Sequence, residues 1–435
     1  MLPPLRVGIA GLGTVGLAVV RLLHRRASAL AAMTGRPIAI AGICAKERGK
    51  NRGIDLASFR WYDDAAELAV SPEIDCFVEL IGGAEAPART AVEAALNAGK
   101  SVVTANKAML AQHGLALAKR AEEKGVALGF EASVAGGIPI VKTLREALAG
   151  NTIERVYGIL NGTCNYILSR MEAEGLSFAE CLKEAQRLGY AEADPSFDIG
   201  GYDTAHKLAI LTALAFGTTI DPDAIAIEGI ESITPADIEA AADLGYRIKL
   251  LGVANRTDAG IEQRVHPSMV PRSSAIAQVM GVTNAVTIDA DAIHELTLIG
   301  PGAGGEATAS AVVADIADIA RGTHIAPFGL PVASLAPLDR APLQMHQGGY
   351  YIRLYVYDRP GAAAAIATRM AECDISLESI MQRRGPGEKA KQAEAVPVIL
   401  ITHATYEKMI HQALEAVVKD GFIAEKPQVI RIERD

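Results

Sequence analysis

The sequence has few cysteines and no arrangement of them that would form a metal or redox motif. Five cysteines are scattered through 435 residues without a C-x-x-C pair, and the nine histidines show no H-x-x-x-H pairing. These absences argue against a zinc site and against a disulfide framework. They fit a reducing compartment, and we expect the protein to be cytoplasmic.

Long apolar segments and a positive net charge are also missing. The longest strongly apolar helical stretch, residues 208–216, is far shorter than the roughly 20 residues that cross a bilayer. Residues 7–20 are apolar, but glycines interrupt them and no basic segment precedes them, so we expect no secretory signal. With 42 Lys and Arg against 51 Asp and Glu, the net charge is −9, a poor match to a phosphate backbone. We therefore expect neither a membrane nor a nucleic-acid partner.

The first third of the chain alternates short apolar strands with Ala-rich helical patterns. Strands are predicted at 5–10, 38–44, 76–81, 101–104 and 126–130, and helices at 14–24, 86–98 and 110–124. Such βα alternation is typical of a parallel sheet with helices on both faces. We predict an α/β, Rossmann-type doubly wound domain over residues 1–149, completed by a helix near 305–325.

The rest of the chain divides into two further parts. Residues 150–325 mix longer helices (166–174, 178–188, 204–216) with strands, which predicts an α+β domain. Four prolines, Pro327, Pro331, Pro337 and Pro342, indicate a linker over 326–348. Residues 349–435 follow the order βαββαβ, with a charged loop between the second and third strands, and this split βαβ unit is large enough for a separate module.

A glycine-rich turn joins the first predicted strand to the first predicted helix. It matches G-x-G-x-x-G through Gly11, Gly13, Thr14, Val15 and Gly16. The glycines permit a tight turn and close approach of a pyrophosphate, and the helix N-terminus attracts its negative charge. A dinucleotide site is the favoured interpretation, and a purely structural glycine turn is the alternative.

The residues that would select between NAD and NADP lie after the second strand. Glu47 suits a free ribose 2′-hydroxyl, whereas the cations around it suit a 2′-phosphate, namely Lys46, Arg48, Lys50 and Arg52. A solvated charged loop is the alternative to either role. The excess of positive charge favours NADP.

Two lysines are candidates for the reaction centre. Asp203 and Lys207 are four residues apart at the start of an apolar helix, so they share one face. A lysine there can stabilise a developing alkoxide and deliver its proton, while carboxylates hold a substrate ammonium. Lys107 follows a strand of the first domain, at the edge where α/β sheets bind ligands. A surface ion pair and a solvated lysine are the respective alternatives.

A further glycine-rich turn follows the strand that ends at Phe130. It contains Glu131, Val134, Gly136 and Ile138, and such a loop can direct several carbonyl oxygens at one cation. Spacing alone supports only a turn.

Several segments together resemble the homoserine dehydrogenase family. They are the glycine turn, residues 102–108 and 161–168, residues 189–207, and Gly302 to Gly304 ahead of residues 308–312. The 189–207 segment is the one specific to that family. Residues 350–433, with Asp358-Arg359-Pro360-Gly361, resemble an ACT regulatory domain, and the absence of a kinase-like segment before Met1 resembles the monofunctional form.

The resemblance implies an activity and a set of roles. The family reversibly reduces L-aspartate 4-semialdehyde to L-homoserine with NAD(P)H, on the route to threonine and methionine. It implies Lys207 as general acid, Lys107 between nicotinamide and substrate, and sodium held by Glu131, Val134, Gly136 and Ile138. Substrate contacts are implied for Glu192, Asp203, Asp198, Thr163 and Lys107. Cofactor contacts are implied for Gly11, Gly13, Thr14, Val15, Gly16, Lys46, Arg48, Thr104, Lys107, Gly189 and Gly304. It also implies that residues 150–325 are the catalytic, substrate-binding and dimerisation domain. It further implies a homodimer or homotetramer, with threonine as an effector at the ACT domain.

Two positions depart from the family pattern. Cys164 replaces a small hydroxyl residue that is common there, which we interpret as a packing change, and Ala45 stands where an arginine for the 2′-phosphate often appears nearby.

Two rival functions follow from the residues. One is an acylating semialdehyde dehydrogenase with Cys164 as nucleophile, which needs an activated thiolate. The other is a non-catalytic sensor of a nucleotide and an amino acid.

Overall fold

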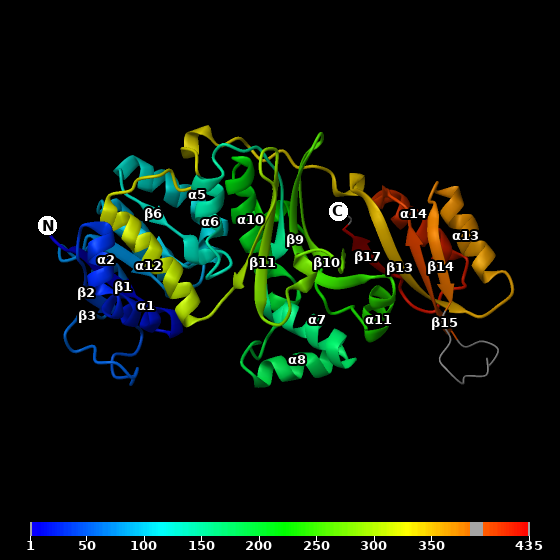
Figure 1. The fold of residues 1–435 in the computed structure, drawn as a ribbon, viewed down its shortest axis with the longest axis horizontal. Coiled ribbons are helices and arrows are strands. Elements are labelled where there is room, and N and C mark those ends of the chain that lie inside the picture. Colours follow the sequence, from blue (N-terminus) through cyan, green and yellow to red (C-terminus); the bar gives the residue numbers. More distant parts are fainter. Residues whose placement is uncertain (1, 383–394, 434–435) are drawn as a thin grey trace.

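The computed structural model describes residues 2–382 and 395–433. The molecule is elongated, and its N-terminal, central and C-terminal parts lie in a row (Figure 1). In the described ranges we find no helix that combines the length and the apolar character required to cross a membrane.

The N-terminal part is a parallel six-stranded sheet with helices on its faces. Its strand order is β3-β2-β1-β4-β5-β6, and all neighbouring strands are parallel. The strands are β1 (Leu5–Ala10), β2 (Ile38–Cys44), β3 (Arg60–Tyr62), β4 (Cys76–Glu79), β5 (Ser101–Thr104) and β6 (Leu128–Gly129). The helices are α1 (Thr14–Arg25), α2 (Ala27–Thr34), α3 (Ala65–Val70), α4 (Ala88–Asn97) and α5 (Lys107–Lys124). The predicted Rossmann-type α/β fold is confirmed.

A helix from much later in the chain belongs to this N-terminal part. The helix α12 (Gly305–Arg321), yellow in Figure 1, packs against the blue α1. Its buried Val312 and Ile316 share one apolar cluster with Ile9 and Val19. Apolar burial of this kind, about 1.5–3 kcal/mol for each large side chain, holds α12 against the sheet.

The central part is built on a mixed sheet that carries helices on one side. Its helices are α6 (Ile140–Lys142), α7 (Gly162–Glu174), α8 (Phe178–Arg187), α9 (Ser196–Ile199), α10 (Tyr202–Phe216) and α11 (Pro235–Asp243). Its strands are β7 (Ile153–Ile159), β8 (Ala226–Ile227), β9 (Tyr246–Thr257), β10 (Gly260–Pro271), β11 (Thr283–Ala290) and β12 (His294–Pro301). The main order is β12-β11-β7-β9-β10, with antiparallel neighbours.

The long hairpin β9–β10 was not among the strands predicted above. Both strands are buried on both faces over most of their length, and charged residues interrupt the apolar pattern that would reveal them. Arg264 is 2% exposed and forms a 2.5 Å ion pair with Glu262 on the same strand. Such paired charges are tolerated in a core, but the pairing is invisible in the sequence.

The C-terminal part has the predicted βαββαβ order. It comprises β13 (Gln347–Tyr357), α13 (Ala362–Glu372), β14 (Leu377–Gln382), β15 (Ala395–Thr402), the short β16 (Thr405–Tyr406), α14 (Glu407–Lys419) and β17 (Gln428–Ile432). Its strand order is β17-β13-β15-β14. The charged loop predicted between β14 and β15 lies outside the described residues.

The C-terminal sheet continues the central sheet. The last strand, β17, pairs with β13 on one side and with β10 on the other, where Ser268 faces Arg431 and Met269 faces Ile432. Arg353 of β13 also forms a 2.7 Å ion pair with Asp237 of α11, whose side chain is fully buried. The C-terminal part is therefore joined to the central part by backbone pairing and by a buried charge pair.

Candidate active site

The glycine turn after β1 has the packing that its sequence predicted. Gly11 has φ 101°, and a Cβ atom there would lie 2.3 Å from the Leu80 carbonyl oxygen. A Cβ at Gly16 would lie 2.0 Å from the Gly11 carbonyl oxygen. A Cβ atom at Gly13, in contrast, would have no atom within 4 Å apart from those of its chain neighbours. Protein packing thus requires the first and third glycines, and the second faces open space that a ligand can enter.

Two helix N-termini meet at this turn. The helix α1 begins with Thr14 and carries Val15 in its first turn, and α12 begins after Gly304; neither N-terminus is capped by a side chain. A Cβ atom at Gly305 would lie 3.1 Å from the Thr14 carbonyl oxygen, so the two ends are adjacent. Free N–H groups at two neighbouring positive helix ends fit the pyrophosphate of a dinucleotide.

A buried carboxylate fixes the carboxyl ends of β4 and β5. Glu79, which is fully buried, accepts a 2.5 Å hydrogen bond from the Thr104 hydroxyl and also accepts the N–H groups of residues 81 and 82. Asn106 caps α5 and donates to the Gly83 carbonyl oxygen. This network sets the position of Lys107, the first residue of α5. Glu79 was missed in the sequence, where an acidic residue inside an apolar strand was the available signal.

The site centres on one aspartate between two lysines. Asp203 accepts Lys107 Nζ on Oδ1 and Lys207 Nζ on Oδ2, both at 2.7 Å. Lys107 comes from the N-terminal part, whereas Asp203 and Lys207 lie one turn apart on α10 of the central part. The structure thus brings together the two lysines that the sequence analysis singled out separately.

One N–H of the Lys207 ammonium has no acceptor among the described residues. It donates to the Leu160 carbonyl oxygen at 2.6 Å and to Asp203, and an ammonium has three N–H groups. Asn161 donates to Oδ1 of Asp198 and Oδ2 of Asp203, both at 2.8 Å, while it caps α7. The role of Asn161 as a bridge between the two carboxylates was also missed, although its place before a helix marks it as a capping residue.

The charges of the cluster shift its pKa values. Burial alone would raise the pKa of Asp203, but the charges of Lys207 and Lys107 outweigh burial and hold this pKa well below its ordinary value. Burial lowers the pKa of Lys207, and the positive charge of Lys107 lowers it further, despite the opposing effect of Asp203. Burial and the nearby Asp203 charge raise the pKa of Asp198. A buried lysine with a lowered pKa is suited to exchanging a proton with substrate.

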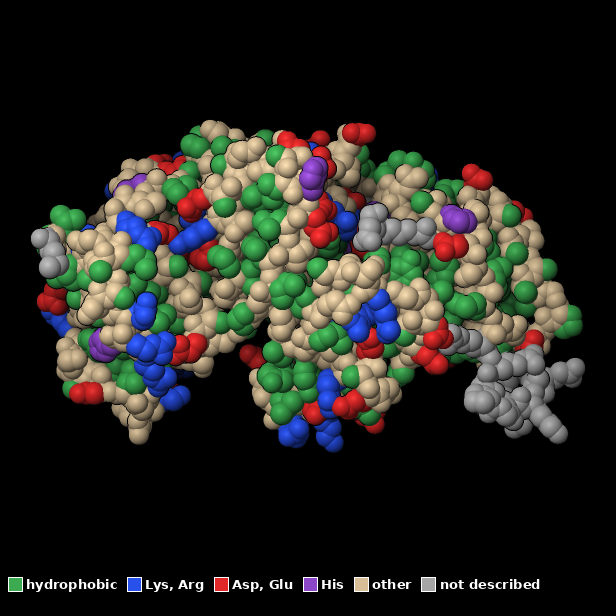
Figure 2. All heavy atoms as spheres, viewed as in Figure 1, with side chains coloured by type: hydrophobic (Ala, Val, Ile, Leu, Met, Phe, Trp, Pro, Cys, Tyr) green, Lys and Arg blue, Asp and Glu red, His purple; other side chains and the backbone are tan. Residues whose placement is uncertain are grey.

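Other predicted substrate and cofactor residues surround this cluster at different depths. Thr163 is buried and donates to the Tyr190 carbonyl oxygen at 2.7 Å. Glu192 is exposed. Burial lowers the pKa of Lys107, but the charge of Asp203, with smaller contributions from Asp198 and Glu192, raises it overall. Gly189, with φ 77°, precedes this exposed loop. In Figure 2 the surface is indented between the N-terminal part and the helices α7 and α8.

Cys164 has the properties of a packing residue. It is fully buried, and its thiol donates to the Asp198 carbonyl oxygen at 3.2 Å. Burial, followed by the negative charges of Asp198 and Asp203, raises its pKa well above the ordinary value. The thiolate that an acylating mechanism needs is therefore disfavoured.

Two arginines of the loop after β2 lie close to the aromatic ring of Trp61. The guanidinium carbons of Arg48 and Arg52 lie 5.8 and 5.6 Å from the centre of the Trp61 ring. Lys46 and Glu47 are exposed on the same loop, and Arg52 donates to the Glu47 carbonyl oxygen at 2.5 Å. Trp61 was not predicted as part of this region, because it lies on β3, beyond the charged loop.

The turn after β6 folds back on a buried carboxylate. Both carboxylate oxygens of Glu131 accept backbone N–H groups, at 2.9 Å from Val141 and 2.8 Å from Lys142. Burial, with the nearby Asp315 charge, raises the pKa of Glu131 to about 7. The described residues contain no cluster of three or more His, Cys, Asp or Glu that would hold a metal. Any cation here would depend on backbone oxygens.

Two carbonyl oxygens of this turn accept no backbone hydrogen bond from the described residues, and a third accepts one. Among the described residues, no backbone N–H donates to the carbonyl oxygens of Val134 and Gly136, whereas that of Ile138 accepts the N–H of Ile140 at 2.8 Å. Ala135 and Gly136 have φ values of 52° and 49°, which sharply reverse the chain. The turn is therefore compatible with the predicted backbone ligands.

Comparison with known sequences gives consistent matches over the whole chain. Residues 11–131 match the family model described as homoserine dehydrogenase, NAD binding domain, and residues 139–317 match the model described as homoserine dehydrogenase. A homoserine dehydrogenase of Pseudomonas aeruginosa is 45% identical over 95% of each chain. One of Neisseria gonorrhoeae is 42% identical over 99% of each chain.

Solved structures give the same result. A homoserine dehydrogenase from Thiobacillus denitrificans superimposes with a TM-score of 0.93 at 43% identity, over 99% of this chain and 98% of that one. A hyperthermophilic archaeal homoserine dehydrogenase in complex with NADPH superimposes with a TM-score of 0.64 at 27% identity, over 74% of this chain and 99% of that one.

Proposed function

The chain belongs to the homoserine dehydrogenase family, and on that basis we propose that Lys207 is its general acid and base, with Lys107 and Asp203 completing the catalytic group. The family acts on a CH–OH group, and it interconverts L-homoserine and L-aspartate 4-semialdehyde with NAD(P). The observation that carries the proposal is the chain of 2.7 Å contacts Lys107–Asp203–Lys207 between the nucleotide-binding and central parts.

The proton transfer follows from the donors of Lys207. NAD(P), when bound, supplies the hydride for aldehyde reduction and accepts it in alcohol oxidation. As the aldehyde oxygen gains negative charge, the free N–H of Lys207 donates a proton to it. In the reverse direction the neutral Lys207 amine takes the proton of the homoserine hydroxyl. Lys107 contacts the other carboxylate oxygen of Asp203, and we assign its positive charge to stabilising the same substrate oxygen.

The carboxylates divide into two roles. Asp203 already accepts hydrogen bonds from Lys107, Lys207 and Asn161, so we assign it to holding the lysines in place. We assign Glu192 and Asp198 to the substrate ammonium, because Glu192 is exposed and, among the described residues, Asp198 accepts a side-chain hydrogen bond on one oxygen only, from Asn161. We also assign Thr163, in the first turn of α7 next to the Asn161 cap, to the substrate pocket.

We propose NADP as the preferred cofactor. The support is the pair of guanidinium groups of Arg48 and Arg52 beside Trp61, which offer positive charge and a flat surface where the adenosine end of a dinucleotide is expected. Gly11, Gly13, Thr14, Val15, Gly16 and Gly304 are assigned to its pyrophosphate, and Lys46, Thr104 and Gly189 to its remaining contacts. The archaeal relative bound to NADPH is consistent with this preference.

We propose that sodium binds at the turn after β6, through the carbonyl oxygens of Val134, Gly136 and Ile138. Glu131 contributes by fixing the turn, since both of its carboxylate oxygens accept backbone N–H groups.

We further propose that residues 349–435 have an ACT-type regulatory role, with threonine as effector. We also propose that the protein forms a homodimer or homotetramer and is located in the cytoplasm.

One rate measurement tests the assignment of function. Purified protein is incubated with L-homoserine and either NADP or NAD, with and without sodium and threonine, and absorbance is followed at the reduced-nicotinamide band. We expect faster reduction of NADP than of NAD, stimulation by sodium and inhibition by threonine. No reduction of either nucleotide would refute the catalytic proposal, and equal rates would refute the cofactor preference.

A further inference from the structure

A buried lysine outside the catalytic group has no part in the reaction proposed above. Lys249 lies on β9 and is 1% exposed. Its ammonium donates to three uncharged acceptors, namely the Asn165 side-chain oxygen at 3.0 Å, the Val279 carbonyl oxygen at 2.5 Å and the Met280 sulfur at 3.5 Å. All three N–H groups of the ammonium are therefore engaged.

The charge of Lys249 is costly where it lies. Burial lowers its pKa to about 8, although the charge of Glu172 opposes this effect. Glu172 itself is paired with Arg247 and Arg272, both at 2.9 Å. Removal of an ammonium from water is costly even when the group is fully hydrogen-bonded, and a methionine side chain would fill the same space without that cost. The ammonium is therefore explained by the segments that it joins and not by the stability of the core.

Asn165 joins α7 to the segment that leads into β11. Its amide nitrogen donates to the carbonyl oxygens of Val279 and Thr283, both at 3.1 Å, while its oxygen accepts the lysine ammonium. Nearer the helix N-terminus, a Cβ atom at Gly162 would lie 2.8 Å from the Val282 carbonyl oxygen. Side-chain hydrogen bonds and close backbone packing thus fix the start of α7 against this segment.

The start of α7 also holds the catalytic group. The Leu160 carbonyl oxygen accepts Lys207, and Asn161 bridges the two aspartates while it caps the helix. The N–H of Asn165 donates to the Asn161 carbonyl oxygen at 3.3 Å. Asn165 is therefore one helical turn away from the residue that bridges the aspartates.

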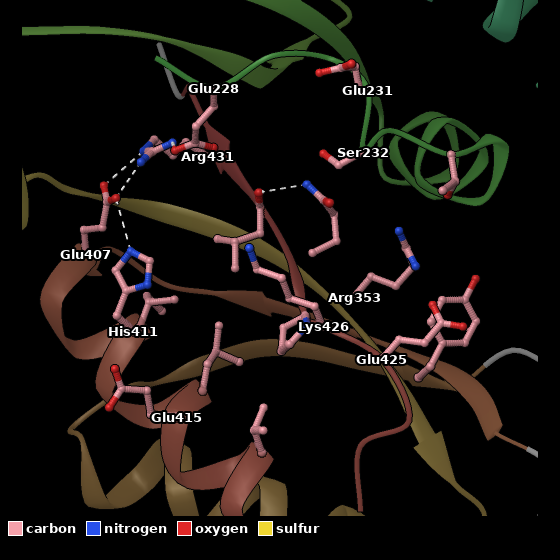
Figure 3. Close-up of a pocket in the computed structure, with 18 of the residues that line it drawn as sticks. Glu228, Glu231, Ser232, Arg353, Glu407, His411, Glu415, Glu425, Lys426 and Arg431 are labelled. Carbon is pink, nitrogen blue, oxygen red and sulfur yellow. Dashed lines mark hydrogen bonds and ion pairs between the residues drawn. The ribbon is translucent and has the colours of Figure 1, made fainter. Parts of the chain in front are cut away.

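The aspartates are held independently, from another direction. The loop of residues 228–232, drawn in Figure 3, contains Ile230, whose N–H donates to the Ile199 carbonyl oxygen at 3.0 Å. A Cβ atom at Gly229 would lie 2.4 Å from the same oxygen, so the two backbones are in direct contact. Ile199 directly follows Asp198. If α7 shifts, the aspartates therefore stay in place, and the contacts that change are those made by the start of α7.

The segment bound by Asn165 continues to the cofactor side. Asn284 is the second residue of β11, and a Cβ atom at Gly302 would lie 2.0 Å from its side-chain nitrogen. Gly302 is two residues before Gly304, which directly precedes α12. Residues 279–284 therefore run from the start of α7 to the loop ahead of α12, and their position sets the distance between the substrate end and the nucleotide end of the site.

We propose that Lys249 and Asn165 are positioning residues for the dehydrogenase reaction. Together they hold the start of α7 and the segment 279–283 in the arrangement that places the Leu160 carbonyl oxygen on Lys207. Both are buried and act through α7, so their loss turns the Lys207 ammonium away without removing a group that binds substrate or nucleotide. The inference rests on the catalytic assignment above and extends it to two residues outside the site.

The test compares homoserine oxidation by the full-length Lys249→Met, Asn165→Ala and double variants. We expect kcat to fall roughly 10²-fold in each single variant, the scale of a small misplacement, while the KM for NADP stays unchanged. The double variant should be no slower than the slower single variant, because all three lose the same anchor. Lys249→Gln keeps an N–H donor and should recover part of the rate. Lys183→Met, which changes an exposed lysine of α8, is the matched control and should leave kcat unchanged.

Two further readouts separate positioning from folding. With homoserine deuterated at carbon 4, the isotope effect on kcat should rise in the variants, because a misplaced hydride transfer becomes the slowest step. The acidic limb of the pH–rate profile should move to lower pH, since the Lys207 ammonium loses an acceptor that stabilises it. A preparation that merely contains less folded enzyme would show neither change.

Unchanged kcat in the Lys249 and Asn165 variants, or additive losses in the double variant, would overturn the proposal. A lower rate with an unaltered isotope effect and pH profile would also overturn it. If Lys249→Met, Asn165→Ala and Lys249→Gln all failed to fold, the two residues would serve folding alone and the proposal would be wrong. A failure of the catalytic assignment is seen separately, as absent oxidation in the unmodified protein.

Discussion

Replacement of Asp203 by asparagine tests the catalytic cluster directly. The change keeps the size of the side chain but removes the negative charge that accepts both lysine ammonium groups at 2.7 Å. An opposite charge this close shifts a pKa by roughly one to three pH units. Burial and Lys107 already lower the pKa of Lys207, and Asp203 opposes them. The substitution should therefore lower this pKa further.

The direction of the effect on activity follows from the proton that Lys207 carries. Homoserine oxidation needs the neutral amine, so the acidic limb of its pH–rate profile should move to lower pH. Aldehyde reduction needs the ammonium, so its activity should be lost at lower pH than in the unmodified enzyme. Because the lysines also lose their common anchor, we expect turnover to fall roughly 10²-fold, the cost of a misplaced catalytic group.

The assay is the initial rate in both directions over a range of pH, together with a thermal unfolding curve. Unfolding reports whether the variant remains folded, since the buried ammonium of Lys207 and the partly buried ammonium of Lys107 lose their shared partner. Asp223→Asn, an exposed position on another segment, is the control and should leave rates and profile unchanged. A folded Asp203→Asn enzyme with unaltered turnover and pH profile would refute the reasoning.

Three other outcomes are expected. Lys207→Ala should lower turnover by roughly 10² to 10⁴-fold, as for a lost general acid, while nucleotide binding measured by fluorescence is retained. Near-normal turnover would show that Lys207 is not the general acid. Arg48→Gln and Arg52→Gln should raise the KM for NADP but not for NAD. An equal rise in the KM for both nucleotides would exclude a contact of these arginines with the 2′-phosphate. Arg353→Ala leaves the fully buried Asp237 without its ion pair, and chemical unfolding should show a loss of about 3–5 kcal/mol; a loss below about 1 kcal/mol would contradict that role.

The glycine turn and the βα alternation were readable in the sequence because they are local. A Cβ atom at Gly11 or Gly16 would lie closer than 3 Å to backbone atoms, so only glycine fits at these two positions of the turn. The same holds for the βαββαβ order, which follows from short-range periodicity. The hairpin β9–β10 escaped prediction because its charged side chains, such as Arg264, pair inside the core rather than facing water.

By itself, the amino-acid sequence determined the α/β fold class, the nucleotide turn, and the face shared by Asp203 and Lys207, because each depends on residues within a few positions of one another. Only the tertiary structure decided that Lys107 reaches the same carboxylate, that α12 joins the N-terminal sheet, and that β17 unites the central and C-terminal sheets. These contacts join segments roughly a hundred or more residues apart, and which distant segments meet is decided by packing of the whole chain rather than by any local pattern.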